Sequence, residues 1–249
     1  MDDIEIKLLE ERASNAHVAL DMMLYDGWIL KFSEGYSHRA NSVGLLYPST
    51  IDPEEKIDYC EKRYAEQNLP CTFKLTDRDT EMYERLVKRG YREASPSDLM
   101  ILALQDLPTP EGTFRFSDRP SEEWLRAYFT FKGYSDPGRQ NTIRRMLAKV
   151  RVETCFAAVL RDGAIAACAS TATERGYALL QNVVTNPCLR RQGIGRTVCL
   201  AMLSKAKQNG AEWAYLQVDT INTPARRMYD SMGFQILYSY RYMEKHLRG

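Results

Sequence analysis

The segment from 180 to 196 decides the fold, and it reads Leu180-Gln181-Asn182-Val183-Val184-Thr185-Asn186-Pro187-Cys188-Leu189-Arg190-Arg191-Gln192-Gly193-Ile194-Gly195-Arg196. It has an apolar strand, a short loop with a proline, and a turn with Gly193 and Gly195 at which a helix is expected to begin. Glycine has no Cβ, so the backbone there can approach a ligand closely. Where a helix begins, free N–H groups and the positive end of the helix dipole face outward. The segment therefore predicts a binding site for a phosphorylated ligand.

The turn does not match the two common nucleotide-binding motifs. A Rossmann dinucleotide-binding turn has a third glycine within a βαβ unit, whereas Arg196-Thr197-Val198 follows Gly195 here. A P-loop requires G-x-x-x-x-G-K-S/T, which the segment lacks. A simple helix cap is the remaining alternative, although a cap has no need of the three clustered arginines Arg190, Arg191 and Arg196.

From residue 113 onward, the chain predicts a mixed sheet. Asp162-Gly163 is a favoured two-residue hairpin turn, so the strands on either side of it are expected to be antiparallel. The strand–helix–strand units that follow favour parallel neighbours. The expected fold class is therefore α/β with a mixed (α+β) sheet. The expected helices cover 121–131, 142–150, 194–209 and 224–232, and the expected strands cover 154–161, 164–173, 177–185, 213–218 and 235–244.

The first half of the chain has its own elements and ends at a linker. Two prolines and a glycine fall within 107–112, which predicts an N-terminal domain over 1–106, a linker over 107–112 and a second domain over 113–249. Asp52-Pro53-Glu54-Glu55 is typical of a helix start. The expected helices cover 5–25, 52–67 and 80–89, and the expected strands cover 28–32, 40–46, 71–75 and 99–104.

Two stretches share one order of elements and one spacing. In each, a helix and a strand precede a polar turn and a second helix, which stops at a glycine followed by an aromatic residue. This indicates a duplicated architecture whose first copy lacks the glycine-rich turn, with chance similarity of common units as the alternative. The matching positions are Asp79, Met82, Leu86, Gly90 and Tyr91 in the first copy and Asn222, Ala225, Tyr229, Gly233 and Phe234 in the second.

Three motifs in the second half resemble those of the GNAT superfamily of N-acetyltransferases. The turn Arg190-x-x-Gly193-x-Gly195 is similar to the superfamily's R/Q-x-x-G-x-G/A signature. The preceding Val183-Val184-Thr185-Asn186-Pro187 resembles its hydrophobic fourth strand, and Asn222-x-x-Ala225-x-x-x-Tyr229-x-x-x-Gly233-Phe234 resembles a downstream segment. The resemblance extends over residues 113–245. With the repeat, it implies two tandem GNAT-like copies, the first one degenerate.

The resemblance also implies an acetyl-CoA-dependent N-acetyltransferase, with acetyl-CoA as cosubstrate and no metal. Backbone groups of Val183, Val184 and Thr185 would pair with the pantetheine arm. Asn222 would contact the pantetheine or orient the loop after it, and Tyr229 would reach the sulfur. The residues that would surround the pyrophosphate are Arg190, Arg191, Gln192, Gly193, Ile194, Gly195 and Arg196.

Acetyl transfer to an amine needs a base, a proton donor and a donor to the oxyanion. An alkylamine has a pKa of about 10, so it must lose a proton before it attacks. The Tyr229 phenol suits protonation of the leaving thiolate, with a purely packing aromatic as the alternative, and a strand N–H suits the oxyanion. Some relatives place a glutamate where this sequence has Gln217. The base is therefore open, with a water chain or His38 as candidates.

Composition limits the class of protein. The chain has 249 residues, of which 44% are hydrophobic and 27% charged, as is typical of globular proteins. It has no apolar run long enough for a membrane helix, and its start is acidic where a signal peptide would be basic. We therefore expect a cytoplasmic protein with no membrane partner. Its six cysteines lack metal-ligand spacing and are expected to be reduced core residues.

Charge is divided unevenly between the halves. Residues 1–110 have 13 Lys and Arg against 21 Asp and Glu, a balance of −8, and residues 111–249 have 21 against 12, a balance of +9. A basic half suits an anionic ligand, although two ordinary solvated surfaces are an equal alternative. No nucleic-acid motif accompanies the arginines, so no nucleic-acid partner is expected.

The expected acceptor is a primary amine of a small molecule or peptide, and the alternative function is a non-catalytic acyl-CoA-binding regulatory protein. The oligomeric state is left open.

Overall fold

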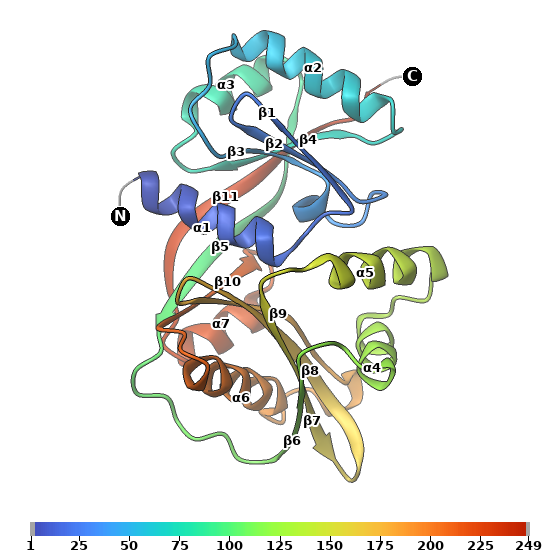
Figure 1. Cartoon of the computed structure of the whole chain (residues 1–249), viewed down its shortest axis with the longest axis vertical. Helices are drawn as coiled ribbons and strands as arrows, with labels where there is room; N and C mark the ends of the chain where they lie inside the picture. The colour runs from blue at the N-terminus through green and yellow to red at the C-terminus, as the bar shows by residue number, and fades with distance from the viewer. Residues whose placement is uncertain (1–2, 248–249) are drawn as a thin grey trace.

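A computed structural model of the protein describes residues 3–247. An 11-stranded sheet runs through the molecule (Figure 1). The strands are β1 (Asp21–Tyr25), β2 (Trp28–Phe32), β3 (Val43–Leu45), β4 (Cys71–Thr76), β5 (Arg92–Ala103), β6 (Thr113–Ser117), β7 (Glu153–Arg161), β8 (Ala164–Glu174), β9 (Tyr177–Thr185), β10 (Trp213–Asp219) and β11 (Gln235–Lys245). The helices are α1 (Asp3–Ala16), α2 (Pro53–Ala65), α3 (Thr80–Lys88), α4 (Glu122–Lys132), α5 (Pro137–Lys149), α6 (Ile194–Gln208) and α7 (Thr223–Ser231), with short 3-10 helices η1 (His38–Ala40) and η2 (Pro187–Leu189).

The strands lie in the order β1-β2-β3-β4-β11-β5-β10-β9-β8-β7-β6. The pairs β3–β4 and β9–β10 are parallel, and the remaining neighbours are antiparallel. The predicted mixed α/β fold with a mixed sheet is therefore confirmed.

The two halves of the chain exchange their long strands. β5, from the first half, pairs with β10 along the whole of β10, and β11, from the second half, pairs with β4. β5 and β11 also pair with each other, so they connect the two ends of the molecule (Figure 1). The division of the chain at 107–112 stays a prediction, and the sheet is continuous across it.

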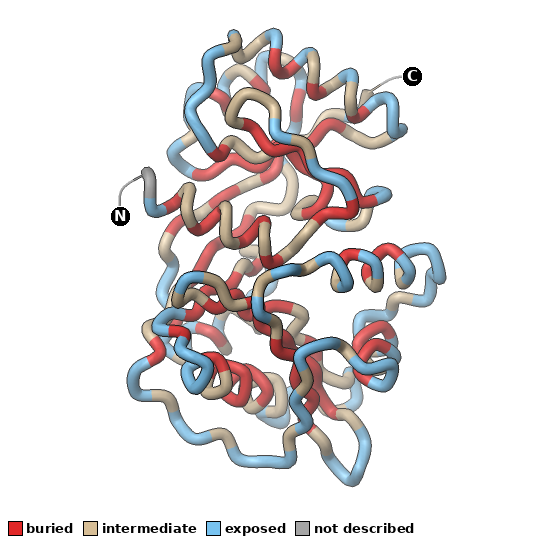
Figure 2. Tube along the Cα trace, in the orientation of Figure 1, coloured by how far each residue is buried: buried red, intermediate tan, exposed pale blue. Residues whose placement is uncertain are grey.

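Helices cover both faces of this sheet, and Figure 2 shows the buried chain concentrated in the strands and the inner sides of the helices. At one end, α2 and α3 cover a core that contains Tyr64, Phe73 and Leu86. At the other end, α6 and α7 cover a core that contains Val198 and Tyr229. Side chains alternate between the two faces of a strand, and on the opposite face α1 crosses the middle of the sheet (Figure 1).

The two copies predicted from the repeat fold alike. In each, a nine-residue helix, α3 or α7, follows a strand and ends at a glycine with positive φ. The φ angles are 83° at Gly90 and 92° at Gly233, a conformation that glycine adopts without strain. The 11-stranded sheet fits a tandem arrangement of two such copies.

Some predicted element boundaries are wrong. The helix expected over 5–25 ends at Ala16, and β1 takes the rest because the positive φ angles of Asp26 and Gly27 close a β1–β2 hairpin. The strand expected over 40–46 is reduced to β3, since the Asn41 side chain bonds the carbonyls of Tyr36 and Ser37 and turns the chain there. β5 begins at Arg92 rather than near 99, and the edge strand β6 was not expected.

Three further expectations from the sequence concern membrane helices, metal-binding groups and cysteines. Across residues 3–247, no helix is both long and apolar enough to cross a membrane. The same residues contain no group of three or more His, Cys, Asp or Glu side chains that could hold a metal ion. Five of the cysteines are buried, Cys188 is exposed, and all six are free.

Candidate active site

The site begins where two parallel strands separate. β9 and β10 pair only from Trp213 with Tyr177 to Tyr215 with Leu179. Beyond that point β9 follows β8, and β10 follows β5. The facing edges of the two strands therefore leave backbone donors and acceptors without a partner strand, and such groups need another partner when they are covered.

A β-bulge interrupts β9 inside this gap. Its partner strand pairs Ser170 with Gln181 and Cys168 with Val184, so one residue of β8 faces two of β9. Asn182 has a φ of 56° at the bulge, and its side chain donates to the Ser170 hydroxyl at 2.8 Å. Bulges redirect the strand locally and leave backbone groups outside the ladder. The bulge thus frees the backbone around Asn182 to face a ligand.

The turn after β9 leads directly into α6. Asn186 caps η2 by accepting from the Cys188 amide at 3.1 Å. Arg191 and Gly193 then have positive φ angles of 61° and 77°. Gly193 is the N-cap of α6 and provides no side chain to cap it. Backbone amides in such a turn converge on a common point, which makes an anion-binding concavity.

The first amides of α6 are free to bind a ligand. The helix's first hydrogen bond runs from the Thr197 amide to the Gly193 carbonyl at 3.0 Å. The amides of Ile194, Gly195 and Arg196 precede it and have no acceptor within the helix. They lie at the positive end of a 15-residue helix. This is the geometry that binds phosphate.

The two glycines of the turn have different roles. A Cβ at Gly193 would meet no atom within 4 Å, so this position needs glycine for its φ angle. A Cβ at Gly195 would lie 3.1 Å from the Thr185 hydroxyl and 3.6 Å from Met228 sulfur. Gly195 therefore allows the start of α6 to lie close against the end of β9.

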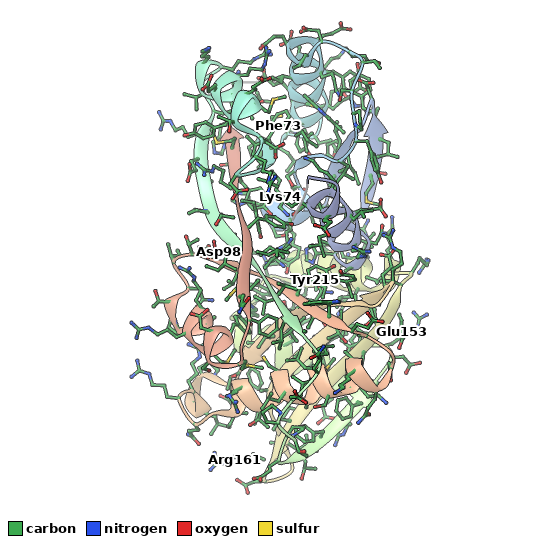
Figure 3. All side chains as sticks on the ribbon, turned by 90° about the vertical axis from the view of Figure 1, so that its left-hand side faces the viewer. Phe73, Lys74, Asp98, Glu153, Arg161 and Tyr215 are labelled. Carbon is green, nitrogen blue, oxygen red and sulfur yellow. The ribbon has the colours of Figure 1, made fainter. Side chains whose placement is uncertain are left out.

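The turn is positively charged. Arg190, Arg191 and Arg196 form no ion pair with any residue that the structure describes. Arg161, at the end of the β7–β8 hairpin, donates a hydrogen bond to Gln192 and supports the turn from the side. Figure 3 places Arg161 at the end of the molecule opposite Phe73. An anion bound here would meet unpaired cations as well as amides.

Tyr229 lies at the inner face of α7, beside the core. It is 7% exposed, and its ring packs edge to face on Phe234 with centroids 5.7 Å apart. Burial, and secondarily the neighbouring Cys199, raises the pKa of Tyr229 well above that of an ordinary phenol. The side chain therefore stays protonated near neutral pH and remains a proton donor. Its contact with the sulfur stays a prediction.

Asn222 caps α7. Its side chain accepts a hydrogen bond from the Ala225 amide at 3.4 Å. Capping orients the start of the helix that carries Tyr229. A contact between Asn222 and the pantetheine stays a prediction.

Three carboxylates of the second half are engaged in hydrogen bonds. Glu153 accepts from Asn209, Glu174 from Asn15, and Asp219 from the Ile221 amide. Gln217 lies on β10 with both polar side-chain atoms buried, and no described residue hydrogen-bonds to them.

His38 is also bound in place. Its Nε2 lies 3.1 Å from a Glu244 oxygen, and its Nδ1 lies 3.1 Å from the Ser95 hydroxyl. The arrangement favours a structural role for His38, and a water molecule remains as the proposed route for the amine proton.

Comparison with known proteins agrees with this fold. In sequence, the chain is similar to "Uncharacterized N-acetyltransferase YobR" of Bacillus subtilis (strain 168), with 24% identity over 98% of this chain and all of that protein. It is also similar, with 31% identity over 30% of the chain, to half of "[Ribosomal protein bS18]-alanine N-acetyltransferase" of Escherichia coli (strain K12).

Solved structures share the fold. A "GCN5-related N-acetyltransferase from Kribbella flavida" superimposes with a TM-score of 0.71 and 17% identity, covering 97% of this chain and 96% of that one. A "Tandem GNAT protein from the clavulanic acid biosynthesis pathway" superimposes with a TM-score of 0.65 and 13% identity, covering 82% and 74%. The fold is that of the GNAT N-acetyltransferases, a class of acyltransferase enzymes.

A family model assigns the chain more closely. Residues 4–243 match the model described as "Probable histone acetyltransferase Rv0428c C-terminal". Because this match spans nearly the whole chain, the protein belongs to that family within the GNAT superfamily. The chain is therefore an N-acetyltransferase, and the tandem GNAT resemblance seen in its sequence is confirmed.

Proposed function

We propose that the protein transfers an acetyl group from acetyl-CoA to a primary amine of a small molecule or peptide. The observation that carries this proposal is the turn before α6. Free amides of Ile194, Gly195 and Arg196 lie there beside three unpaired arginines. This site has the shape and charge that a pyrophosphate requires.

The rest of the cosubstrate would follow the gap between β9 and β10. Val183, Val184 and Thr185 lie on β9 beyond the last β9–β10 pair, and because successive residues direct their backbone groups to opposite edges, part of their backbone faces away from β8. A pantetheine arm carries amides that hydrogen-bond to such an edge in the way a strand does. Gly195 against Thr185 keeps the end of this edge next to the pyrophosphate turn.

The chemistry would take place at the bulge. When bound, acetyl-CoA supplies a thioester whose carbonyl an amine can attack. The backbone N–H groups freed near Asn182 suit the oxyanion, because fixed donors stabilise charge that develops during the reaction. Tyr229, protonated and buried, suits donation of a proton to the departing sulfur. Water would take the proton of the amine.

Thiol release measures this activity directly. Purified protein with acetyl-CoA and a panel of primary amines should release free coenzyme A at a rate that saturates with one class of amine. A thiol reagent reports the product, and mass spectrometry should show the amine gaining one acetyl group. Saturable acetyl-CoA binding without acetyl transfer to any amine would contradict the proposal.

A further inference from the structure

A group of cations lies on the α1-facing side of the first copy's sheet. Lys74 on β4 pairs with Tyr242 on β11 and with Gly44 on β3, and Gly44 pairs with Ile29 on β2. Side chains alternate along strands, so Lys31, two residues after Ile29, is on the same face as Lys74 and Tyr242. A face covered by a helix usually carries apolar side chains, and this one carries two lysines.

The carboxylate that reaches Lys74 from α1 is already bound. Glu10 of α1 accepts two hydrogen bonds from Lys74, at 2.5 and 2.6 Å, and one from the Tyr238 hydroxyl at 2.6 Å. Figure 3 shows Lys74 beside α1. Glu10 thus pairs with Lys74, and it acts on Lys31 through its charge without a hydrogen bond or ion pair.

Lys31 is left without a hydrogen-bonded counter-ion. The residue is 5% exposed, and its side chain forms no hydrogen bond or ion pair with any residue the structure describes. Burial, together with the charge of Lys74, lowers the pKa of Lys31 to about 7. The Tyr242 hydroxyl on the same face is also buried and lacks a hydrogen-bond partner among residues 3–247. A buried hydroxyl without a hydrogen-bond partner is costly unless a ligand or water satisfies it.

Arg39 is the second unpaired cation. It lies in η1, half-buried, and forms no ion pair with the described part of the chain. Two acidic side chains of this part of the molecule already have partners. Glu34 binds Arg145 at 2.6 Å, and Glu244 binds His38 at 3.1 Å. The His38 ring, next to Arg39, lies 5.0 Å from the Tyr242 ring, which brings η1 against the same face.

The segment that carries Arg39 lies toward the bulge, because Ala40 packs in one cluster with Tyr36, and Tyr36 lines a pocket together with Asn182. Burial and Cys199 raise the pKa of Tyr229, and the charge of Arg39 opposes this rise. A small pocket of about 20 Å³ lies beside the bulge, and His17, Tyr36, Gln181 and Asn182 are among its lining residues. Burial, followed by the charges of Arg39 and Lys31, lowers the pKa of His17 to about 3. Lys31 and Arg39 therefore bring positive charge to this region, and neither forms an ion pair with a residue among 3–247.

We propose that Arg39 and Lys31 form a carboxylate-binding subsite, so that the acceptor of this enzyme is an amine that also carries a carboxylate. The proposal rests on the acetyltransferase function proposed above and names the acceptor class. Arg39 offers the planar guanidinium that matches a carboxylate, and Lys31 lies behind it as a second charge. The carboxylate is held by the first copy, and the amine is thereby positioned toward the bulge and Tyr229 of the second copy.

Matched acceptor pairs test the subsite. Thiol release is measured with amino carboxylates and with their carboxamides, such as glycine and glycinamide, leucine and leucinamide, and glutamate and glutamine α-amide. The proposal predicts that the carboxylate exceeds its carboxamide in kcat/KM by roughly tenfold to a hundredfold, as expected for hydrogen bonds to a charged group. Arg39→Gln should remove this preference, and Arg39→Lys should keep part of it. Arg241→Gln, which removes an exposed cation paired with Glu93, should leave the preference unchanged.

A binding measurement separates the subsite from catalysis. N-acetylated amino acids and their amides are titrated into the full-length protein by calorimetry at pH 8, in two buffers of different ionisation enthalpy. A bound carboxylate raises the pKa of Lys31 from about 7, so binding should take up protons, and Lys31→Met should abolish the uptake. An intact thermal unfolding transition in each variant confirms that it is folded.

Each outcome has a separate meaning. Equal turnover of carboxylates and carboxamides would overturn the subsite and leave the acetyltransferase proposal intact. Absence of turnover with every amine, combined with selective and proton-linked binding of N-acetyl carboxylates, would overturn the proposed function and retain the subsite. Absence of selective binding, or stronger selection of an aminophosphonate than of the matching carboxylate, would overturn the carboxylate assignment.

Discussion

Leu86 occupies in the first copy the position that Tyr229 occupies in the second. The Tyr91 amide donates to the Leu86 carbonyl at 3.0 Å, and the Phe234 amide donates to the Tyr229 carbonyl at 3.1 Å, each across a glycine with positive φ. The backbone is therefore the same at both positions, and the side chains differ. Leucine offers no proton, so the chemistry we propose belongs to the second copy, where the phenol lies close to the α6 turn.

Removing the Tyr229 hydroxyl should slow turnover and spare binding. Tyr229→Phe keeps the ring against Phe234, and general acid catalysis is worth about 10² or more in rate. We expect kcat to fall by roughly that factor while acetyl-CoA affinity stays within about twofold. Steady-state thiol release and calorimetry measure the two quantities. Tyr215→Phe, which removes another buried phenol, should change neither, and an unchanged kcat in Tyr229→Phe would assign the tyrosine to packing.

Gly193 should be needed for the cosubstrate as well as for the fold. Gly193→Ala places a Cβ on a residue with a φ of 77°, which costs about 1 kcal/mol of unfolding free energy and distorts the amides before α6. We expect the affinity for coenzyme A to fall by about tenfold or more. Gly163→Ala is the matched control, because its φ is 78° and its Cβ would also meet nothing within 4 Å. In urea unfolding, Gly163→Ala should lose a similar amount of stability, but its affinity for coenzyme A should not change. Equal losses of affinity in the two variants would contradict a role of the Gly193 turn in binding coenzyme A.

Glu10 should make the free energy of unfolding depend on pH in the acid range. Burial works to raise its pKa, but the charge of Lys74 and hydrogen bonds from Lys74 and Tyr238 lower it below 4.5 overall. A carboxyl whose pKa is lower in the folded state than in the unfolded state stabilises the fold fully at a pH above its unfolded-state pKa. This stabilisation is lost as the pH falls through the folded-state pKa. Urea unfolding between pH 7 and pH 3 should therefore show a decline that is smaller in Glu10→Gln.

The Glu10–Lys74 ion pair can also be tested at neutral pH. Glu10→Gln leaves Lys74 buried beside an uncharged partner, and we expect a loss of about 3 kcal/mol. Glu93→Gln breaks the exposed pair with Arg241 and should cost less than about 1 kcal/mol. Similar losses in the two variants would show that the Glu10–Lys74 pair contributes no more than a surface pair.

Arg226 should hold α7 on the sheet. Its guanidinium lies 2.9 Å from an Asp98 oxygen, and the Asp98 side chain is 4% exposed. Arg226→Met leaves that carboxylate buried without a cation, which we expect to cost about 3 kcal/mol in urea unfolding. Arg227→Met, an exposed neighbour on the same helix, should change stability by less than about 0.5 kcal/mol. A double variant with Asp98→Asn should recover part of the loss, and strictly additive losses would contradict the pairing.

The features that local chemistry encodes could be predicted from the sequence. Gly193 indicates a left-handed turn before a helix, and Gly90 and Gly233 indicate the ends of two matching helices, because glycine is favoured wherever φ is positive. The mixed sheet followed from hairpin turns and strand–helix units. These signals lie within a few residues of each other in the chain.

Features built by distant contacts could not be predicted. The exchange of β5 and β11 depends on pairing between strands more than 100 residues apart, such as Leu99 with Tyr238. The bulge at Asn182 is fixed by Ser170 on the neighbouring strand. Lys31 lies in a strand that is otherwise apolar, and Arg39 lies in a polar loop. Nothing in their local sequence therefore shows that both lie near the side of the sheet that faces α1.

Amide NMR of the glycines tests the central claim most directly. Protein labelled with ¹⁵N-glycine is titrated with coenzyme A, and the signals are assigned through single glycine substitutions. The account predicts that the signals of Gly193 and Gly195 shift and saturate together, while that of Gly90, in the copy without the turn, stays in place. Saturation of binding with Gly193 and Gly195 unmoved, or no saturation at all, would contradict the assignment of the pyrophosphate to the start of α6.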